Sequence, residues 1–101
     1  LRLPPNSSAL NVQRIPATGD LLLVRSSDGP KEPPHRRTPF VSVLSKDDGA
    51  TWTDERVIAG DPEDDYGYPS LMFVEDLALI SYHQRDGLHV ARIGIDWFYG
   101  K

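Results

Sequence analysis

Short apolar segments alternate with clusters of Gly, Pro and Asp along almost the whole chain. Most of these segments are rich in β-branched or aromatic residues, which is the pattern of strands separated by turns. The pattern predicts seven strands: Asn11–Ile15, Leu21–Ser26, Phe40–Leu44, Glu55–Ile58, Ser70–Val74, Ala78–Tyr82 and Leu88–Ile93.

Evidence for helices is weak. Nine prolines and eight glycines are spread so that no long segment sustains a period of 3.6 residues. Only Ile95–Tyr99 suits a single turn of helix, and it suits a final strand equally well. The expected fold class is therefore all-β. Seven strands also suit a sandwich, but their grouping into Asn11–Ile58 and Ser70–Ile93 favours two propeller blades.

One turn carries a dense set of hydrogen-bonding residues. Asp47 and Gly49 suit a tight turn, because an Asp side chain bonds nearby amides and Gly accepts a positive φ. Ser45 and Thr51 can add local hydrogen bonds across the turn. Trp52 then supplies a large apolar ring beside the hairpin. We expect these five residues to have a structural role.

Composition limits the classes of function. The 101 residues, 39% hydrophobic and 26% charged, indicate one small folded unit. The net charge of -4 disfavours nucleic-acid binding, which needs a clustered basic surface. The absence of cysteine excludes disulfides and thiolate metal sites and leaves the compartment open.

The ends of the chain and its apolar runs give a second set of expectations. No apolar run approaches the ~20 residues of a membrane helix, so no membrane partner is expected. The first residues, Leu1–Pro5, lack the charged and apolar regions of a signal peptide. Met72 is the only methionine, so the chain does not begin at an encoded start residue. The expected explanations are processing, cloning, or origin as a piece of a longer protein.

The turn described above belongs to a named pattern. Residues 45–52 read Ser-x-Asp-x-Gly-x-Thr-Trp, which resembles the Asp-box of sialidase-like, BNR-repeat β-propellers. The resemblance extends from about Asn11 to Tyr99 through further segments in the same order: Arg14-Ile15-Pro16, Gly19-Asp20-Leu21-Leu22-Leu23-Val24, Arg37-Thr38-Pro39-Phe40, Tyr66-Gly67-Tyr68-Pro69-Ser70-Leu71 and Ile93-Gly94-Ile95-Asp96-Trp97-Phe98-Tyr99.

The resemblance implies the C-terminal two blades of a six-bladed propeller. Each would be an antiparallel four-stranded blade, at about 9–60 and 66–101. Two blades cannot close a propeller and would leave sheet faces and edges exposed. The expected partners are therefore the remaining blades of a parent protein or copies of the chain itself.

The resemblance also assigns two site residues. Arg37 matches the position of an arginine that binds the substrate carboxylate in sialidases, and Arg36 is an adjacent competitor. Tyr68 matches the place of the catalytic tyrosine, with Tyr66 as the alternative ring. The structural alternatives are that Arg37 caps a loop or pairs with acidic residues, and that Tyr68 is a half-buried strand residue.

The implied function is a C-terminal fragment of a sialidase-like glycoside hydrolase acting on terminal sialic acid or a related sugar. The other triad arginines, the acid/base Asp and the Glu that activates the tyrosine belong to blades outside this chain. The chain alone should therefore be catalytically incomplete. The alternatives are a glycan- or protein-binding propeller without hydrolysis and a ring of identical copies. Relatives are often secreted or periplasmic.

No metal or cofactor is expected. His35, His83 and His89 lack metal-ligand spacing, so we expect structural or solvated roles. The acidic segment Asp61–Asp65 offers oxygen ligands for Ca²⁺, but a solvated loop is the preferred interpretation.

Overall fold

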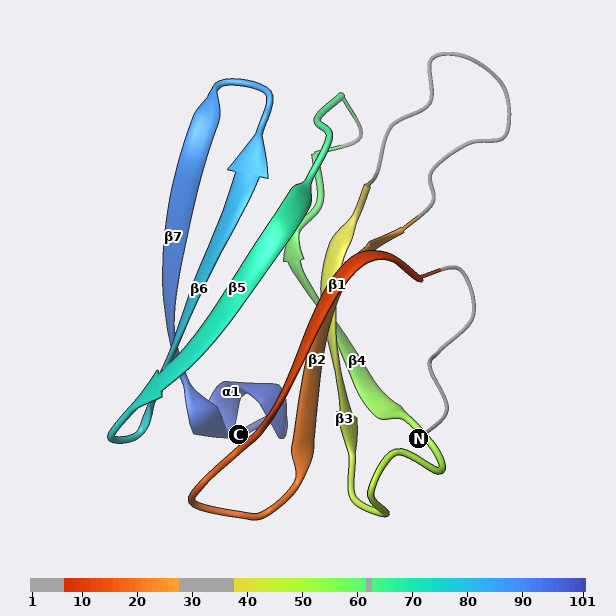
Figure 1. Cartoon of the computed structure of the whole chain (residues 1–101), viewed down its shortest axis with the longest axis vertical. Coiled ribbons are helices and arrows are strands. Elements are labelled where there is room, and N and C mark those ends of the chain that lie inside the picture. The colour runs from red at the N-terminus through yellow and green to blue at the C-terminus, as the bar shows by residue number, and fades with distance from the viewer. Residues whose placement is uncertain (1–6, 28–37, 62) are drawn as a thin grey trace.

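The computed structural model describes residues 7–27, 38–61 and 63–101 and shows an all-β chain. Its strands form two antiparallel sheets in the orders β1-β2-β3-β4 and β5-β6-β7, so each sheet is a simple meander (Figure 1). The described elements are β1 (Ser7–Arg14), β2 (Leu21–Ser27), β3 (Phe40–Ser45), β4 (Thr53–Ala59), β5 (Gly67–Val74), β6 (Leu77–Gln84), β7 (Gly87–Gly94) and the short helix α1 (Ile95–Phe98).

The all-β prediction is confirmed, and the strand starts differ most. β1 begins at Ser7 and β5 at Gly67, several residues before the predicted starts. In β5 the pairing register shifts between Gly67 and Ser70, and this bulge accommodates Pro69 within the strand. After β7 the chain forms α1, which decides between the two alternatives left open for this segment.

The finer blade prediction is met only in part. The first sheet has the four expected strands, whereas the second has three among the described residues. Residues 95–98, which follow β7, form the helix α1 instead of a fourth strand. Neither sheet closes on itself within the described ranges.

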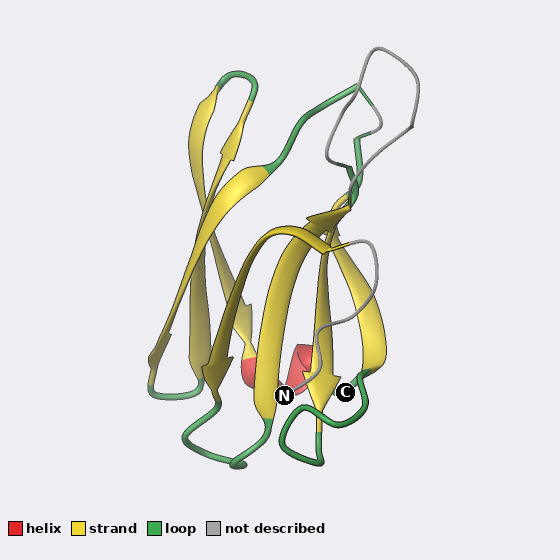
Figure 2. Cartoon of the chain, turned by 45° about the vertical axis from the view of Figure 1, so that its right-hand side comes forward, coloured by secondary structure: helices red, strands yellow, loops and turns green. Residues whose placement is uncertain are grey.

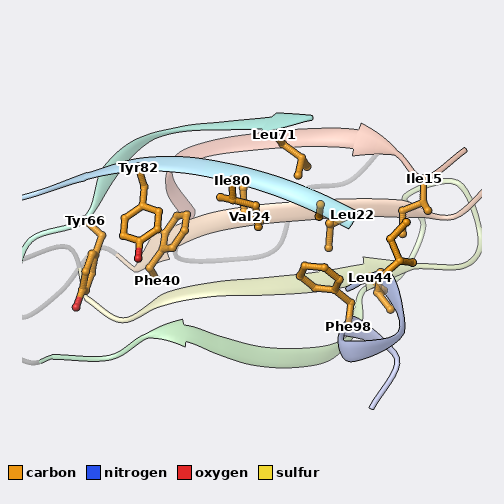
Figure 3. Close-up of a cluster of buried hydrophobic side chains, with 12 residues drawn as sticks. Ile15, Leu22, Val24, Phe40, Leu44, Tyr66, Leu71, Ile80, Tyr82 and Phe98 are labelled. Carbon is orange, nitrogen blue, oxygen red and sulfur yellow. The ribbon is translucent and has the colours of Figure 1, made fainter. Parts of the chain in front are cut away.

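The two sheets pack face to face around one apolar core (Figure 3). Leu22, Val24 and Phe40 from the first sheet meet Ile80 and Tyr82 from the second. Burying one such side chain fully contributes about 1.5–3 kcal/mol, so this shared core holds the sheets together. The complete cluster is Ile15, Leu22, Val24, Phe40, Leu44, Tyr66, Leu71, Ala78, Ile80, Tyr82, Ile95 and Phe98.

Two features fix how the sheets sit against each other. Strand β1 is the strand of the first sheet that lies closest to β5, and Asn11 Nδ2 donates a hydrogen bond to the Pro69 carbonyl at 3.3 Å. At one end α1 contacts both β3 and β7 and lies between the two sheets (Figure 2). The fully buried ring of Phe98 anchors this helix in the core.

The two ends of the first sheet carry different features. Strand β3 runs from Phe40 at one end to Ser45 at the other, a span of about 17 Å at ~3.3 Å per residue. The turn after Ser45 therefore lies at the opposite end from Phe40, as Figure 1 shows. Strand β5 begins at the end of the molecule where β3 begins, as Figure 1 shows. Tyr68 is the second residue of β5.

Candidate functional site

The turn between β3 and β4 is closed by one carboxylate and one hydroxyl. Thr51 donates twice to Asp47, from its main-chain N to Oδ1 at 2.8 Å and from Oγ1 to Oδ2 at 2.6 Å. Ser45 Oγ donates to Asp47 Oδ1 at 2.8 Å and accepts the Gly49 N–H at 2.7 Å. Gly49 has a φ of 89°, a conformation that glycine accepts without strain.

These hydrogen bonds favour the ionised form of the Asp47 carboxylate. The hydroxyl of Thr51, then its main-chain N–H and then the hydroxyl of Ser45 lower the pKa of Asp47 from 3.8 to about 2. The carboxylate is therefore committed to the turn as a hydrogen-bond acceptor. Ser45 is buried and Trp52 is half-buried, so both contribute to packing beside the hairpin.

The same end of the molecule is tied to the C-terminal segment. Tyr99 donates its hydroxyl to Asp20 Oδ2 at 2.6 Å and lies 2.9 Å from Thr18 Oγ1. Arg14 Nη1 pairs with Asp48 Oδ1 at 2.9 Å across the exposed surface of the turn. These contacts connect the β1–β2 connection, the β3–β4 turn and the residue after α1 at the same end of the molecule.

Tyr68 lies at the opposite end and is exposed. Its relative exposure is 73%, and its φ of 51° is in the left-handed region that bulky residues rarely adopt. The ring meets the imidazole of His83 edge-on, with centroids 5.6 Å apart. The bulge in β5 therefore directs a large aromatic ring to the surface beside a histidine.

Tyr66 has the opposite environment, although it is only two residues away. Its relative exposure is 2%, and its ring packs near Phe40 and Tyr82 at centroid separations of 6.2 and 6.0 Å. The hydroxyl accepts the Asp61 N–H at 3.1 Å. Burial is the main cause that raises the pKa of Tyr66. The structure therefore places Tyr66 in the core and leaves Tyr68 as the ring that a ligand can reach.

Arg37, the predicted carboxylate-binding residue, lies outside the described residues, as do Arg36 and His35. The first described residue after Arg37 is Thr38, whose Oγ1 donates to the Asp61 carbonyl at 2.9 Å. Asp61 in turn donates its N–H to the hydroxyl of Tyr66. Thr38 thus belongs to the same end of the molecule as Tyr68.

The acidic segment has a structural role that the sequence did not predict. Asp64 Oδ2 accepts a hydrogen bond from Gln84 Nε2 at 2.8 Å, and Oδ1 accepts the Arg85 N–H at 2.9 Å. Arg85 Nη1 donates to the Glu63 carbonyl at 2.8 Å. The hydrogen bond from the Arg85 N–H is the largest of the effects that lower the pKa of Asp64. Asp64 therefore fastens the β6–β7 turn to the loop before β5.

His89 and Asp86 form a pair of their own at the β6–β7 turn. His89 Nε2 lies 2.8 Å from Asp86 Oδ1, and its ring stacks on Tyr82. Over residues 7–27, 38–61 and 63–101, no group of three or more His, Asp or Glu residues is arranged to hold a metal ion. Within the same ranges, no helix has the length and apolar character needed to span a membrane.

Comparison with family models, with curated proteins and with solved structures finds no match to this chain. The Asp-box pattern and the order of the flanking segments therefore remain the basis of the resemblance stated above. Function is inferred from those segments together with the geometry of the Tyr68 end.

Proposed function

We propose that this chain forms two adjacent blades of a sialidase-like β-propeller, as the C-terminal part of a glycoside hydrolase acting on terminal sialic acid or a related sugar. The four-stranded meander supports the proposal, because the Asp-box turn lies between its third and fourth strands. The close approach of β1, the first strand of one sheet, to β5, the first strand of the next, agrees with neighbouring blades.

Tyr68 is the observation that carries the proposal. A non-glycine residue held in the left-handed region costs on the order of 1–3 kcal/mol, and such residues cluster at functional sites. Tyr68 has this backbone conformation while 73% of its surface is exposed. Burial of the Tyr68 ring in the core therefore does not explain why a tyrosine occupies this strained position.

A tyrosine and an arginine suit a sugar acid. The anomeric carbon of sialic acid bears a carboxylate, which repels an anionic Asp or Glu nucleophile but not a neutral phenol. The guanidinium of Arg37 would hold that carboxylate through two parallel hydrogen bonds. The acid/base Asp and the Glu that activates the tyrosine would come from other blades, so the isolated chain should bind the sugar without cleaving it.

A binding module without hydrolysis is the second candidate. The exposed ring of Tyr68 beside His83 favours it, because an exposed aromatic face offers a surface on which a sugar ring can stack. This candidate predicts affinity for neutral sugars as well as for sialic acid.

The test compares two ligands that differ in one charge. The purified chain is titrated by calorimetry with methyl α-sialoside and with the methyl ester of the same sugar. Charge-assisted hydrogen bonds contribute about 1.5–3 kcal/mol, so the free acid should bind at least tenfold more tightly. Arg37→Ala should abolish the difference, and Arg36→Ala serves as the matched control that keeps it.

Equal affinity for the acid and its ester would rule out a carboxylate-binding site in this chain and leave the neutral-sugar module. If only Arg36→Ala removes the difference in affinity between the acid and its ester, Arg36 and not Arg37 binds the carboxylate. Absence of binding to both ligands would contradict both candidate functions.

A further inference from the structure

The described sheet edges differ in how they are protected against pairing with another strand. Strand β4 has two register shifts against β3 and a left-handed residue, Asp54, close to charged Glu55 and Arg56. Strand β1 contains an irregularity between Ser8 and Leu10 and lies beside β5. Bulges, charges and coverage of this kind are the usual means of blocking sheet edges.

Strand β7 has no register shift, and Arg92 near its C-terminal end is its charged residue. The strand pairs with β6 through eight consecutive residues, from Gly87 to Gly94. Among the described residues no strand pairs with its other side. Within the part of the chain that the structure describes, the result is a regular edge whose outward main-chain groups pair with no strand, and such an edge is prone to add a further strand.

The side chains of β7 also favour association. Leu88 and Val90 are 63% and 62% exposed, and both point to the face away from the core. Met72, from β5, is 61% exposed on the same face. An edge strand that is long, regular and apolar is expected to pair with another chain.

We infer that β7 is a self-association edge. Two copies pair their β7 strands antiparallel around a twofold axis, which joins two three-stranded sheets into one six-stranded sheet. The inference is independent of the proposed sugar site, because it uses only the edge and its side chains.

The distribution of charge identifies a second copy as the partner. Arg92 lies near the C-terminal end of β7, and exposed Asp86 lies in the turn just before its N-terminal end. Antiparallel pairing with Leu88 opposite Val90 of the second copy brings Arg92 of each copy to the turn that carries Asp86 of the other. The edge is therefore complementary to itself in charge and in apolar surface.

The first test is the mass of the full 101-residue chain, measured by light scattering behind a sizing column from micromolar to millimolar concentration. The expected result is a concentration-dependent dimer. A monomer throughout, or a trimer, overturns the inference; a trimer would point instead to three two-blade units closing one ring.

A charge swap tests the register. Arg92→Asp places two carboxylates opposite each other at both ends of the paired strands, so this variant should dimerise at least tenfold more weakly. Asp86→Arg should do the same by placing two cations together. An equimolar mixture of the two variants restores opposite charges at both ends and should recover the dimer. Failure of the mixture to recover while each variant keeps a native circular dichroism spectrum overturns the antiparallel register.

Met72→Lys is the matched control for face-to-face association. Met72 is 61% exposed, against 62% for Val90, and lies on the same face, but it belongs to β5, at the opposite edge of the sheet from β7. Edge pairing predicts that Met72→Lys remains dimeric. Dissociation of this variant would mean that the sheets stack through their faces, which contradicts the inference.

Discussion

Thr51 gives both of its hydrogen-bond donors to the carboxylate of Asp47, one to each oxygen, at 2.8 and 2.6 Å. The two residues are four positions apart, so this pair closes the β3–β4 turn on its exposed side. The hydroxyl of Ser45 closes the same turn on its buried side. The Asp-box pattern is therefore explained by hydrogen bonds within the turn itself.

Asp47→Asn should lower the melting temperature of the chain. The carboxylate of Asp47 accepts hydrogen bonds from both Thr51 donors and from Ser45. The amide of Asn has one acceptor oxygen instead of two and lacks the charge that strengthens these bonds, so at least one of them is lost. The matched control is Asp48→Asn in the same turn, because Asp48 pairs with exposed Arg14 and surface ion pairs contribute little. Equal melting temperatures for the two variants would contradict this role of Asp47.

The stabilisation by Asp47 should depend on pH in a defined direction. Its pKa is about 2 in the folded chain against an ordinary 3.8, so the folded state favours the ionised form. The stabilisation is complete above the ordinary value and is lost as the pH falls through the folded value. The gap in melting temperature between wild type and Asp47→Asn should therefore narrow from about pH 5 to about pH 2. A gap that stays constant over this interval would show that ionisation of Asp47 contributes nothing.

Tyr66→Phe and Tyr68→Phe should differ in their effect on stability. Removing the Tyr66 hydroxyl leaves the Asp61 N–H without its acceptor, at a cost of about 0.5–1.5 kcal/mol in the free energy of unfolding. Tyr68 is 73% exposed, so loss of its hydroxyl should change that free energy by less than about 0.5 kcal/mol. Urea unfolding of both variants measures the difference, and the reverse order would contradict the assignment of Tyr66 to the core.

Asp64→Ala should loosen the β6–β7 turn. The carboxylate accepts from Gln84 Nε2 and from the Arg85 N–H, and both bonds disappear with the side chain. Hydrogen exchange at residues 84–88 should become faster. Glu63→Ala is the control, since Arg85 bonds the main-chain oxygen of residue 63 and that contact survives the substitution. Unchanged exchange in Asp64→Ala would show that the turn does not depend on this residue.

The sequence predicted the elements well where local turn chemistry determines them. The breaks between the predicted strands Ser70–Val74, Ala78–Tyr82 and Leu88–Ile93 fall at the turns that separate β5, β6 and β7 in the structure. The start of β5 was misplaced because Pro69 normally ends a strand, whereas here a bulge retains it. The apolar pattern gives three strands in the second group, as the structure has, whereas the fourth strand implied by the resemblance is replaced by the helix α1 after β7.

The site was less predictable for a related reason. Tyr66 and Tyr68 are two positions apart, so strict alternation would place both rings on one face of the strand. The bulge and the left-handed φ of Tyr68 separate them, and the sequence carries no clear sign of either. The Asp64 contacts with the β6–β7 turn join residues about twenty positions apart, which local patterns cannot detect.

The aromatic NMR signals of Tyr68 give the most direct test of the proposed sugar site. Methyl α-sialoside is added to chain labelled with ¹³C in the tyrosine rings, and Tyr68→Phe assigns the signal. The proposal predicts that the Tyr68 ring signals shift in a saturable manner while those of Tyr99, at the opposite end, stay fixed. Tyr68 signals that do not move at saturating sugar, or equal shifts at Tyr99, would contradict a carbohydrate site at this end of the molecule.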